Sequence, residues 1–329
     1  MSHLRTDLVE VDPTVGGWED ENFRCFMKLE NQQASGSFKD RGMFHLVQTT
    51  AGSADTKEAI SKLISSSGGN AGNSVATVGR MLDIPVEVYV PETTMELMVS
   101  KLKAKGAEVI VGGENWNVAD TVARAAVEST PGALYCPPFD NPLIWKGNSS
   151  IVDEMAMQMN KFSLQETHNQ AFPDAIILSV GGGGLLRGVQ LGLEKLGMND
   201  TKIIAVETIG SASFASAPTR LTSIDSIATS LGSLYVVDEA LKSPIETVSM
   251  VVTDEESIDA CFKYAEDYRV LVEPACGAAL AALSHKYRKT LQEMGVKSCM
   301  VVVCGGSAVS VDLLTRWRGS LKSRSGYHR

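Results

Sequence analysis

Four consecutive glycines, Gly181–Gly184, are the strongest chemical signal in this sequence. They follow the apolar run Ala175–Val180 and precede a segment with a helical pattern, Leu185–Leu196. A strand, a glycine turn and a helix start present backbone N–H groups to an anion, and glycine lets that backbone approach a phosphate closely. The glycines are not followed by the Lys-Ser or Lys-Thr of a nucleoside-triphosphate loop, and their spacing is not GxGxxG. The pattern therefore indicates a site for another phosphate; the alternative is a tight turn that binds nothing.

Lys39 is the residue best placed for covalent chemistry. It follows a loop of small residues and one aromatic, Ser35–Phe38, which comes after an expected strand at Arg24–Glu30. Burial lowers the pKa of a lysine because it disfavours the ammonium form, and a neutral amine can form a Schiff base. The alternative is a surface lysine at the start of a helix. Its occurrence together with the tetraglycine loop favours the chemical interpretation.

A third motif, Ser65–Gly72, is rich in serine, glycine and asparagine. It lies between an expected strand at Ala59–Ile64 and an expected helix at Ser74–Leu82. Backbone N–H groups, hydroxyls and an amide at a helix start suit a carboxylate or a phenolate-like ring oxygen. An ordinary helix cap within a flexible loop would use the same residue types, and it remains the alternative.

These motifs together resemble the serine/threonine dehydratases, which are fold type II pyridoxal-phosphate (PLP) enzymes. The matching segments keep the family order: SGSFKDRG (35–42), SSGGNAG (66–72), PPFDNPLIWKGNSS (137–150), SVGGGGLLRG (179–188), AVETIGSASF (205–214), SIATSLG (226–232), LVEPACGAALAAL (271–283) and VVVCGGS (301–307). The resemblance implies a two-domain α/β fold like that of tryptophan synthase β, with helix-covered, mostly parallel sheets and PLP in the cleft between the domains. It also implies conversion of L-serine to pyruvate and ammonia, and of L-threonine to 2-oxobutanoate and ammonia.

The resemblance also implies a role for each motif. The lysine of the family motif holds PLP as a Schiff base and then takes the Cα proton of the substrate; Lys39 occupies that place. The cofactor phosphate would be bound by Gly181, Gly182, Gly183, Gly184 and Leu185. Asn70 would bind the ring oxygen, and the substrate carboxylate would be held by Ser67, Gly68, Gly69, Asn70 and Ala71. A monovalent cation, K⁺, would be bound by Glu207 with carbonyls near Gly181, Ser211, Leu231 and Ser233; the alternative for Glu207 is a glutamate at a helix start.

In the family, the position of Cys304 faces the pyridine nitrogen of PLP. A thiol, with a reference pKa of about 8.5, cannot protonate that nitrogen as a carboxylic acid would. A neutral ring is the weaker electron sink, which favours early loss of the β-hydroxyl over transamination or racemisation. From the sequence alone, Cys304 is equally compatible with a small core residue.

Some positions depart from the family pattern. Thr6-Asp7-Leu8 stands where Thr-Pro-Leu is usual, Asp40 follows the lysine as in threonine synthases, Asn148 replaces a common histidine and Ala308 a common asparagine. They keep open a serine racemase or a threonine synthase-like PLP enzyme. A non-catalytic PLP-binding homologue is the other alternative, which the intact Lys39 and tetraglycine loop oppose.

Composition limits the other classes of protein. The chain has 329 residues, a net charge of −9 and 44% hydrophobic residues, which suggests about two domains and opposes nucleic-acid binding. We expect a small domain at residues 39–137 and a large PLP-binding domain at 1–38 plus 138–329, with Pro131–Pro142 crossing between them. No apolar run is long enough to span a membrane, residues 1–12 do not resemble a leader, and six scattered cysteines are typical of a reducing compartment. We therefore expect a cytoplasmic protein, and the resemblance implies a homodimer with a small amino-acid substrate.

Apolar runs alternate with helical patterns along the chain, which favours parallel, helix-covered sheets. The runs expected as further strands are Val86–Val90, Glu108–Val111, Ala175–Val180, Ile203–Val206 and Met300–Val303. Further helices are expected at Met95–Lys105 and Ile258–Tyr268.

Overall fold

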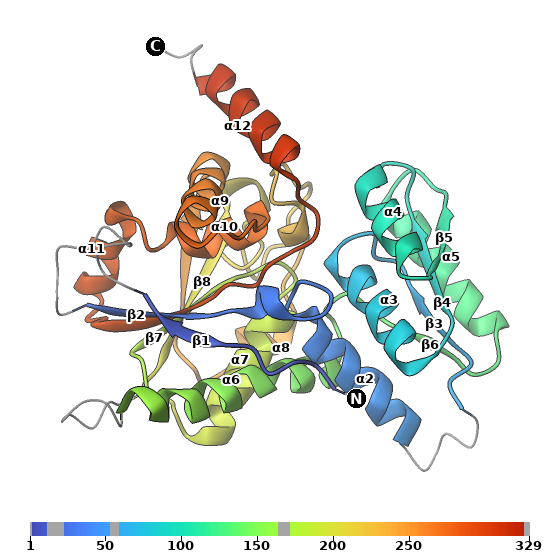
Figure 1. The fold of residues 1–329 in the computed structure, drawn as a ribbon, viewed down its shortest axis with the longest axis horizontal. Coiled ribbons are helices and arrows are strands. Elements are labelled where there is room, and N and C mark those ends of the chain that lie inside the picture. The colour runs from blue at the N-terminus through green and yellow to red at the C-terminus, as the bar shows by residue number, and fades with distance from the viewer. Residues whose placement is uncertain (1, 12–22, 53–58, 164–171, 326–329) are drawn as a thin grey trace. The chain divides into compact units, whose positions relative to one another are not determined.

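The structure, a computed structural model, describes residues 2–11, 23–52, 59–163 and 172–325 (Figure 1). The chain divides into two compact units, described here one at a time. Unit 1 comprises residues 1–4 and 33–148, and unit 2 comprises residues 5–32 and 149–329. The small domain expected from the sequence, residues 39–137, lies inside the bounds of unit 1.

Unit 1 is built on a four-stranded, fully parallel sheet with the order β5-β4-β3-β6. Its strands are β3 (Lys62–Ser65), β4 (Val86–Val90), β5 (Glu108–Val111) and β6 (Ala133–Tyr135). Its helices are α2 (Lys39–Gly52), α3 (Asn70–Leu82), α4 (Glu96–Ala104) and α5 (Trp116–Ser129). Apolar side chains from α2, α3 and the central strands, among them Phe44, Leu63 and Val75, form one buried core.

Unit 2 is built on a six-stranded sheet with the order β1-β2-β10-β7-β8-β9. Its strands are β1 (Leu8–Glu10), β2 (Arg24–Lys28), β7 (Ala175–Ser179), β8 (Lys202–Thr208), β9 (Thr247–Val252) and β10 (Ser298–Val302). Only the β1–β2 pair is antiparallel among these pairings. Every residue of β7 is buried, as expected where helices cover both faces of a parallel sheet.

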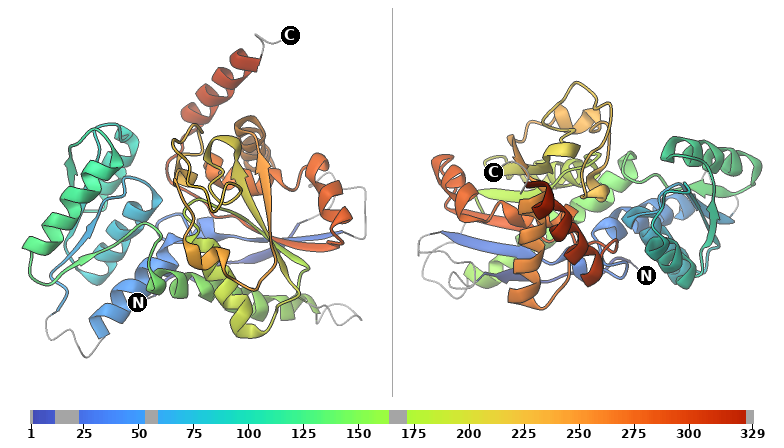
Figure 2. Two further views of the ribbon diagram at one scale, coloured as in Figure 1. Left: turned by 180° about the vertical axis from the view of Figure 1, so that it is seen from behind. Right: turned by 90° about the horizontal axis from the view of Figure 1, so that it is seen from above.

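Helices lie on both faces of the six-stranded sheet (Figures 1 and 2). One face carries α9 (Asp254–Tyr268) and α10 (Pro274–Ala281), and the other carries α7 (Gly184–Leu196) and most of α6 (Pro142–Ser163), which begins in unit 1. The remaining helices are α8 (Asp238–Leu241), α11 (His285–Glu293) and α12 (Val311–Ser325), with 3-10 turns η1 (Glu30–Gln32), η2 (Ile209–Ser211) and η3 (Thr229–Leu231). The predicted α/β class with mostly parallel sheets is confirmed.

Several predicted bounds are wrong for local reasons. The strand expected at Ala59–Ile64 is β3, which starts only at Lys62; the exposed residues before it run outside the sheet. The strand expected at Arg24–Glu30 ends at Lys28, because Glu30 begins η1. The segment Pro131–Pro142, expected to be a connection, contains the three-residue strand β6, which is too short to give a periodic signal.

The parallel strands of the two sheets explain why motifs far apart in the sequence all lie at carboxyl ends of strands. Parallel strands end at the same edge of a sheet, and ligands of open α/β sheets bind outside the carboxyl ends of the strands. In unit 1 the Ser67–Ala71 loop follows β3; in unit 2 the glycine loop follows β7 and Cys304 follows β10. The fold thus presents these three motifs at the carboxyl edges of the two sheets, whereas Lys39 begins α2 and follows no strand of its own unit.

Candidate active site

Lys39 is the first residue of α2 and is half-buried. Its Nζ donates a 2.7 Å hydrogen bond to the carbonyl of Pro138 and lies 5.1 Å from the centre of the Phe38 ring. The turn before it is tight: Gly36 has a φ of +86°, and its N–H donates to the Gln33 carbonyl at 2.7 Å. The tight turn at Gly36 and the Phe38 ring therefore restrict the direction in which the Lys39 side chain extends from the loop.

The serine-glycine loop ends in the first turn of α3. The helix begins at Asn70, earlier than the predicted Ser74, so Asn70 and Ala71 lie within it. Its N-cap is Gly69, and no side chain caps this end, which leaves the positive end of the helix suited to an anion. A Cβ on Gly72 would lie 1.7 Å from the Ser67 carbonyl oxygen, so glycine is required for the loop to fold back this closely.

A polar network that the sequence did not indicate supports this loop. Ser66 donates to Asp120 Oδ1 at 2.6 Å, and the hydroxyl of Tyr135 donates to the same oxygen. Arg124 Nε donates to Asp120 Oδ2 at 2.8 Å. Although burial pushes the pKa of Asp120 upward, these hydrogen bonds hold it below its usual value. The loop is therefore anchored to α5 and β6 by an ionised carboxylate.

The tetraglycine loop joins β7 to α7, as predicted. Gly183 is the N-cap of α7 with a φ of +85°, and no side chain caps the helix. The carbonyls of Gly182 and Gly183 accept hydrogen bonds from the N–H groups of Val237 and Arg187 at 3.1 and 2.8 Å. Because a trans peptide turns its N–H away from its carbonyl, the N–H groups of Gly183 and Gly184 point the opposite way, beyond the helix start. Backbone N–H groups at the start of a helix suit an anion.

Cys304 is buried directly after β10. Its thiol is hydrogen-bonded to Cys276 at the start of α10, and this bond together with burial raises its pKa well above the usual value. The nearby charge of Glu273 raises it further, while the neighbouring Ser179 hydroxyl opposes the shift. Cys304 is therefore a neutral thiol, and a poor proton donor, at the carboxyl edge of the sheet.

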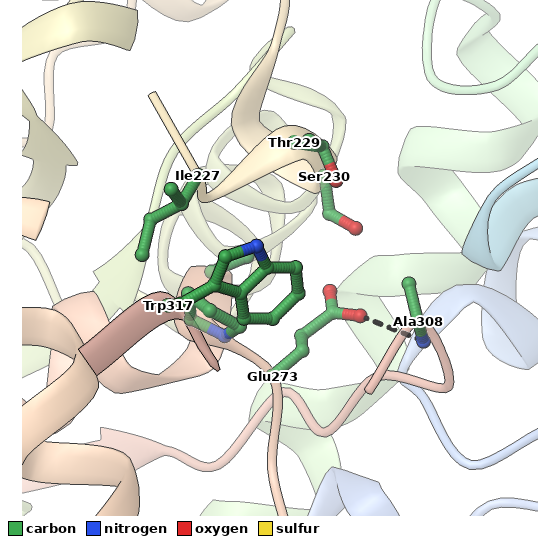
Figure 3. Close-up of a pocket in the computed structure, with 8 residues that line it drawn as sticks. Ile227, Thr229, Ser230, Glu273, Ala308 and Trp317 are labelled. Atoms are coloured by element: carbon green, nitrogen blue, oxygen red, sulfur yellow. Dashed lines mark hydrogen bonds between the residues drawn. The ribbon is translucent and has the colours of Figure 1, made fainter. Parts of the chain in front are cut away.

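The loop after Cys304 is fitted closely around Glu273, which lines a small pocket with Ala308 and Trp317 (Figure 3). Glu273 Oε2 accepts a 3.3 Å hydrogen bond from the N–H of Ala308. Gly306 has a φ of +117°, and a Cβ there would lie 2.0 Å from the Glu273 carboxyl carbon. Glycine at this position is therefore required, and Glu273 fixes the course of the loop that carries Cys304.

Glu207 is fully buried in β8. Its two carboxylate oxygens accept hydrogen bonds from the N–H groups of Phe214 and Ala215 at 2.7 and 2.8 Å. Burial raises its pKa, and donors from Ser213, Phe214 and Ala215 oppose the rise. The sequence did not single out Ser213, whose Oγ donates to the Gly181 carbonyl at 3.1 Å and lies 3.4 Å from Glu207 Oε1.

The structure brings together part of the predicted cation ligand set. Ser213 links Glu207 to Gly181, and a Cβ on Gly181 would lie 3.1 Å from the Leu231 carbonyl oxygen. The Ser211 carbonyl accepts from the Ser213 N–H at 3.0 Å, and the N–H of Ser233 donates to the Leu231 carbonyl at 2.7 Å. The carboxylate of Glu207 and several backbone carbonyls therefore lie beside the tetraglycine loop.

Two features are absent from the part of the chain that the structure describes. No group of three or more His, Cys, Asp and Glu side chains is arranged to hold a metal ion. None of the described helices is both long enough and apolar enough to cross a membrane.

Comparisons with known proteins agree with this geometry. A family model described as "Pyridoxal-phosphate dependent enzyme" matches residues 2–305. The chain is 42% identical over 303 residues to the human L-serine dehydratase/L-threonine deaminase, covering 88% of this chain and 87% of the relative. It is 36% identical over 319 residues to the L-serine dehydratase of Dictyostelium discoideum, covering 94% and 89%. A crystal structure of a fungal L-serine ammonia-lyase from Rhizomucor miehei matches with a TM-score of 0.84 and 32% identity, covering 96% of this chain and 98% of that one. With its strand–glycine–helix loop and its motif lysine, the chain belongs to the family of pyridoxal-phosphate-dependent enzymes.

Proposed function

We propose that this protein is an L-serine ammonia-lyase, which converts L-serine to pyruvate and ammonia and also accepts L-threonine, giving 2-oxobutanoate and ammonia. The observation that carries the proposal is Lys39, held in a tight loop of a chain that is 42% identical to a curated L-serine dehydratase/L-threonine deaminase. Threonine adds one methyl group to serine, a difference worth only about 1–3 kcal/mol in a pocket. Strong exclusion of threonine is therefore not expected.

The residues of each unit fit PLP. In unit 2 the uncapped start of α7 and the positive φ of Gly183 suit the phosphate. The neutral Cys304 thiol, with the Ser179 hydroxyl beside it, suits an unprotonated pyridine nitrogen. In unit 1, Lys39 supplies the amine, and the uncapped start of α3 suits the substrate carboxylate. On this proposal Lys39 and the glycine loop bind the same cofactor molecule.

The residues divide the work of the reaction. When bound, PLP withdraws electrons from the substrate Cα. Lys39 removes the Cα proton, and the β-hydroxyl leaves with one proton as water, so that the substrate loses one H₂O in all. Hydrolysis of the released aminoacrylate consumes one H₂O and gives pyruvate and ammonia. Ser67, Gly68, Gly69, Asn70 and Ala71 hold the substrate carboxylate and fix the direction of the Cα–H bond. Because Cys304 stays protonated, it does not deliver a proton to the ring, which favours elimination over transamination.

A K⁺ ion beside Glu207 is the second part of the proposal. Oxygen ligands suit a hard cation. The Ser213 hydroxyl joins the buried Glu207 to the Gly181 carbonyl, and the Leu231 carbonyl lies beside Gly181. A buried carboxylate whose pKa is raised by burial would gain most from such a charge. The ion would order the segment that follows the phosphate loop.

The proposed homodimer and cytoplasmic location rest on the family resemblance and on cysteine usage. All six cysteines are free and buried, as expected in a reducing compartment. Sedimentation equilibrium of the purified protein would give its mass in solution, and fractionation of its native cells would give its location. A monomer, or a protein recovered from a secretory compartment, would overturn the respective proposal.

The function is tested by the products formed from four amino acids. The PLP-loaded protein in potassium buffer is given L-serine, L-threonine and their D-forms, and 2-oxo acid, ammonia and D-serine are quantified. We expect equal amounts of pyruvate and ammonia from L-serine, with the Lys39→Ala variant inactive yet folded by circular dichroism. D-serine without pyruvate would identify a racemase instead. No 2-oxo acid from either L-amino acid would overturn the proposal.

A further inference from the structure

Asp40 departs from the sequence pattern of the dehydratase family, and the function proposed above assigns it no role. It follows Lys39 in the first turn of α2, and it is completely buried. An acidic residue near a helix N-terminus is ordinarily exposed and interacts with the helix dipole. Burying a carboxylate is costly unless specific partners compensate it. The contacts of Asp40 therefore need an explanation of their own.

The carboxylate of Asp40 joins two segments of unit 1. Its Oδ2 accepts a 2.8 Å hydrogen bond from the N–H of Ser35, in the loop that precedes Lys39. Its Oδ1 accepts a 2.6 Å hydrogen bond from the hydroxyl of Ser74 on α3. Hydrogen bonds to an ionised acceptor are short and roughly twice as strong as neutral ones. One side chain thus ties the lysine loop directly to the helix that begins with Asn70.

A second contact holds the same residue, Ser35, at its carbonyl. Asn73 Nδ2 donates a 2.8 Å hydrogen bond to the Ser35 carbonyl. The N–H of Ser35 is thus bound by Asp40 and its carbonyl by α3, so this residue is held at both polar groups. The loop containing Lys39 has little freedom to shift along α3.

Burial and the groups around Asp40 act on the pKa of its carboxyl group in opposite directions. Burial raises the pKa of Asp40, while the hydrogen bonds from Ser35 and Ser74 and the charge of Lys105 oppose the rise. The amine of Lys105 also donates to the hydroxyl of Thr77, one turn beyond Asn73 on α3. The cationic group that faces Asp40 is therefore itself attached to α3.

We propose that Asp40 is a positioning residue, which fixes the Lys39 amine relative to the Ser67–Ala71 loop by binding Ser35 and Ser74 at once. Asn70 lies one helical turn before Ser74, and Lys39 directly precedes Asp40, so only short, rigid segments separate the two ends. This inference rests on the proposed function, in which the amine must meet the Cα proton of a substrate held by that loop. A displacement of about 1 Å between reacting groups costs about 100-fold in rate.

Three variants separate positioning from general stability. Asp40→Ala removes both hydrogen bonds, and Ser74→Ala removes one. Asp40→Asn keeps both, because its amide oxygen accepts from Ser35 and its NH₂ donates to the Ser74 hydroxyl. The matched control is Asp174→Ala: Asp174 Oδ2 accepts from the N–H groups of Lys297 and Ser298 at 2.9 and 2.8 Å, at the amino edge of the other sheet.

The measurements are kcat and KM for L-serine, hydrogen–deuterium exchange of the PLP-loaded protein, and the melting temperature. Asp40→Ala is expected to lower kcat about 10- to 100-fold with a smaller change in KM, and to speed exchange in residues 35–38. Ser74→Ala should lie between it and wild type, and Asp40→Asn should stay within about threefold of wild type in kcat. Asp174→Ala should lower the melting temperature but leave kcat and the exchange of residues 35–38 unchanged.

Unchanged exchange and near-normal kcat in both Asp40→Ala and Ser74→Ala would overturn the inference. So would an Asp40→Asn variant as impaired as a folded Asp40→Ala, because the hydrogen bonds would then not be the reason. If Asp40→Ala does not fold, Ser74→Ala and Asp40→Asn decide the question. The exchange measurement needs no turnover, so a wild-type protein that makes no 2-oxo acid would refute the proposed function alone.

Discussion

At the scale of single residues, the site depends on groups whose ionisation is set by burial and a few donors. Burial and the Cys276 hydrogen bond keep the Cys304 thiol protonated by raising its pKa. Three donors at Asp120, in contrast, hold its pKa low despite burial. The same fold thus stabilises a neutral group in one place and an anion in another. In both places the surroundings reinforce the ionisation state that the residue type favours at neutral pH.

Glu207 gives the prediction that belongs to this scale. K⁺ should raise the melting temperature of the wild-type protein relative to Li⁺ at equal ionic strength, because a bound cation offsets the cost of the buried carboxylate. A ligand present at about 100 times its Kd stabilises the folded state by about 2.7 kcal/mol. Thermal unfolding in KCl and LiCl measures the difference, which Glu207→Gln should abolish.

The control for this measurement is Glu273→Gln, at another buried glutamate of the same unit. That variant should keep the difference between K⁺ and Li⁺ even if its melting temperature falls. Equal melting temperatures of the wild-type protein in the two salts would contradict a cation at Glu207, and so would a difference that survives in Glu207→Gln.

At the scale of elements, α7 has a glycine in the left-handed region at each end. Gly183, with φ +85°, is the N-cap residue in the tetraglycine loop, and Gly197, with φ +69°, is the C-cap residue. A Cβ on Gly183 would lie 2.7 Å from Val236 Cγ1, whereas a Cβ on Gly197 would meet nothing within 4 Å. Both positions therefore have a conformation that disfavours L-residues, but only at Gly183 would a side chain also meet neighbouring atoms.

Alanine at these two positions separates strain from binding. Gly197→Ala should lose about 1 kcal/mol of unfolding free energy, since an L-residue is disfavoured in the left-handed region. Gly183→Ala should lose more, because its Cβ would also lie 2.7 Å from Val236 Cγ1. Gly183→Ala should also raise the Kd of PLP about tenfold or more, while Gly197→Ala should leave it unchanged. Urea unfolding of the cofactor-free protein and titration with PLP measure the two effects. Equal PLP affinities of the two variants would argue against a phosphate at Gly183.

The elements that the sequence predicted best are those with the strongest local signal. The apolar runs at Val86–Val90 and Glu108–Val111 match β4 and β5, and the glycine run predicted the turn into α7. Bounds failed where local signals compete. The sequence predicts that α3 begins at Ser74, but the helix begins at Asn70. The true start is missed because the glycine at its N-cap is a weaker start signal than a serine.

At the scale of the whole molecule, what the sequence could not show are contacts between segments far apart in the chain. Ser213 reaches the carbonyl of Gly181 across 32 positions, and Ser74 reaches Asp40 across 34. No periodicity or composition encodes such pairs, since they follow from how the strands are ordered in each sheet. The motifs therefore indicated the chemistry, while the groups that hold the motifs in place required the structure.

The central claim of the proposed function is that Lys39 holds PLP as a Schiff base and that the glycine loop binds its phosphate. It is tested by borohydride reduction of the PLP-loaded protein, followed by peptide mass spectrometry. We expect one pyridoxyl group per chain, located on the peptide that contains Lys39. The yield at limiting PLP should fall in Gly183→Ala and stay unchanged in Gly197→Ala. A group on any other lysine, or an equal yield in Gly183→Ala, would contradict the account.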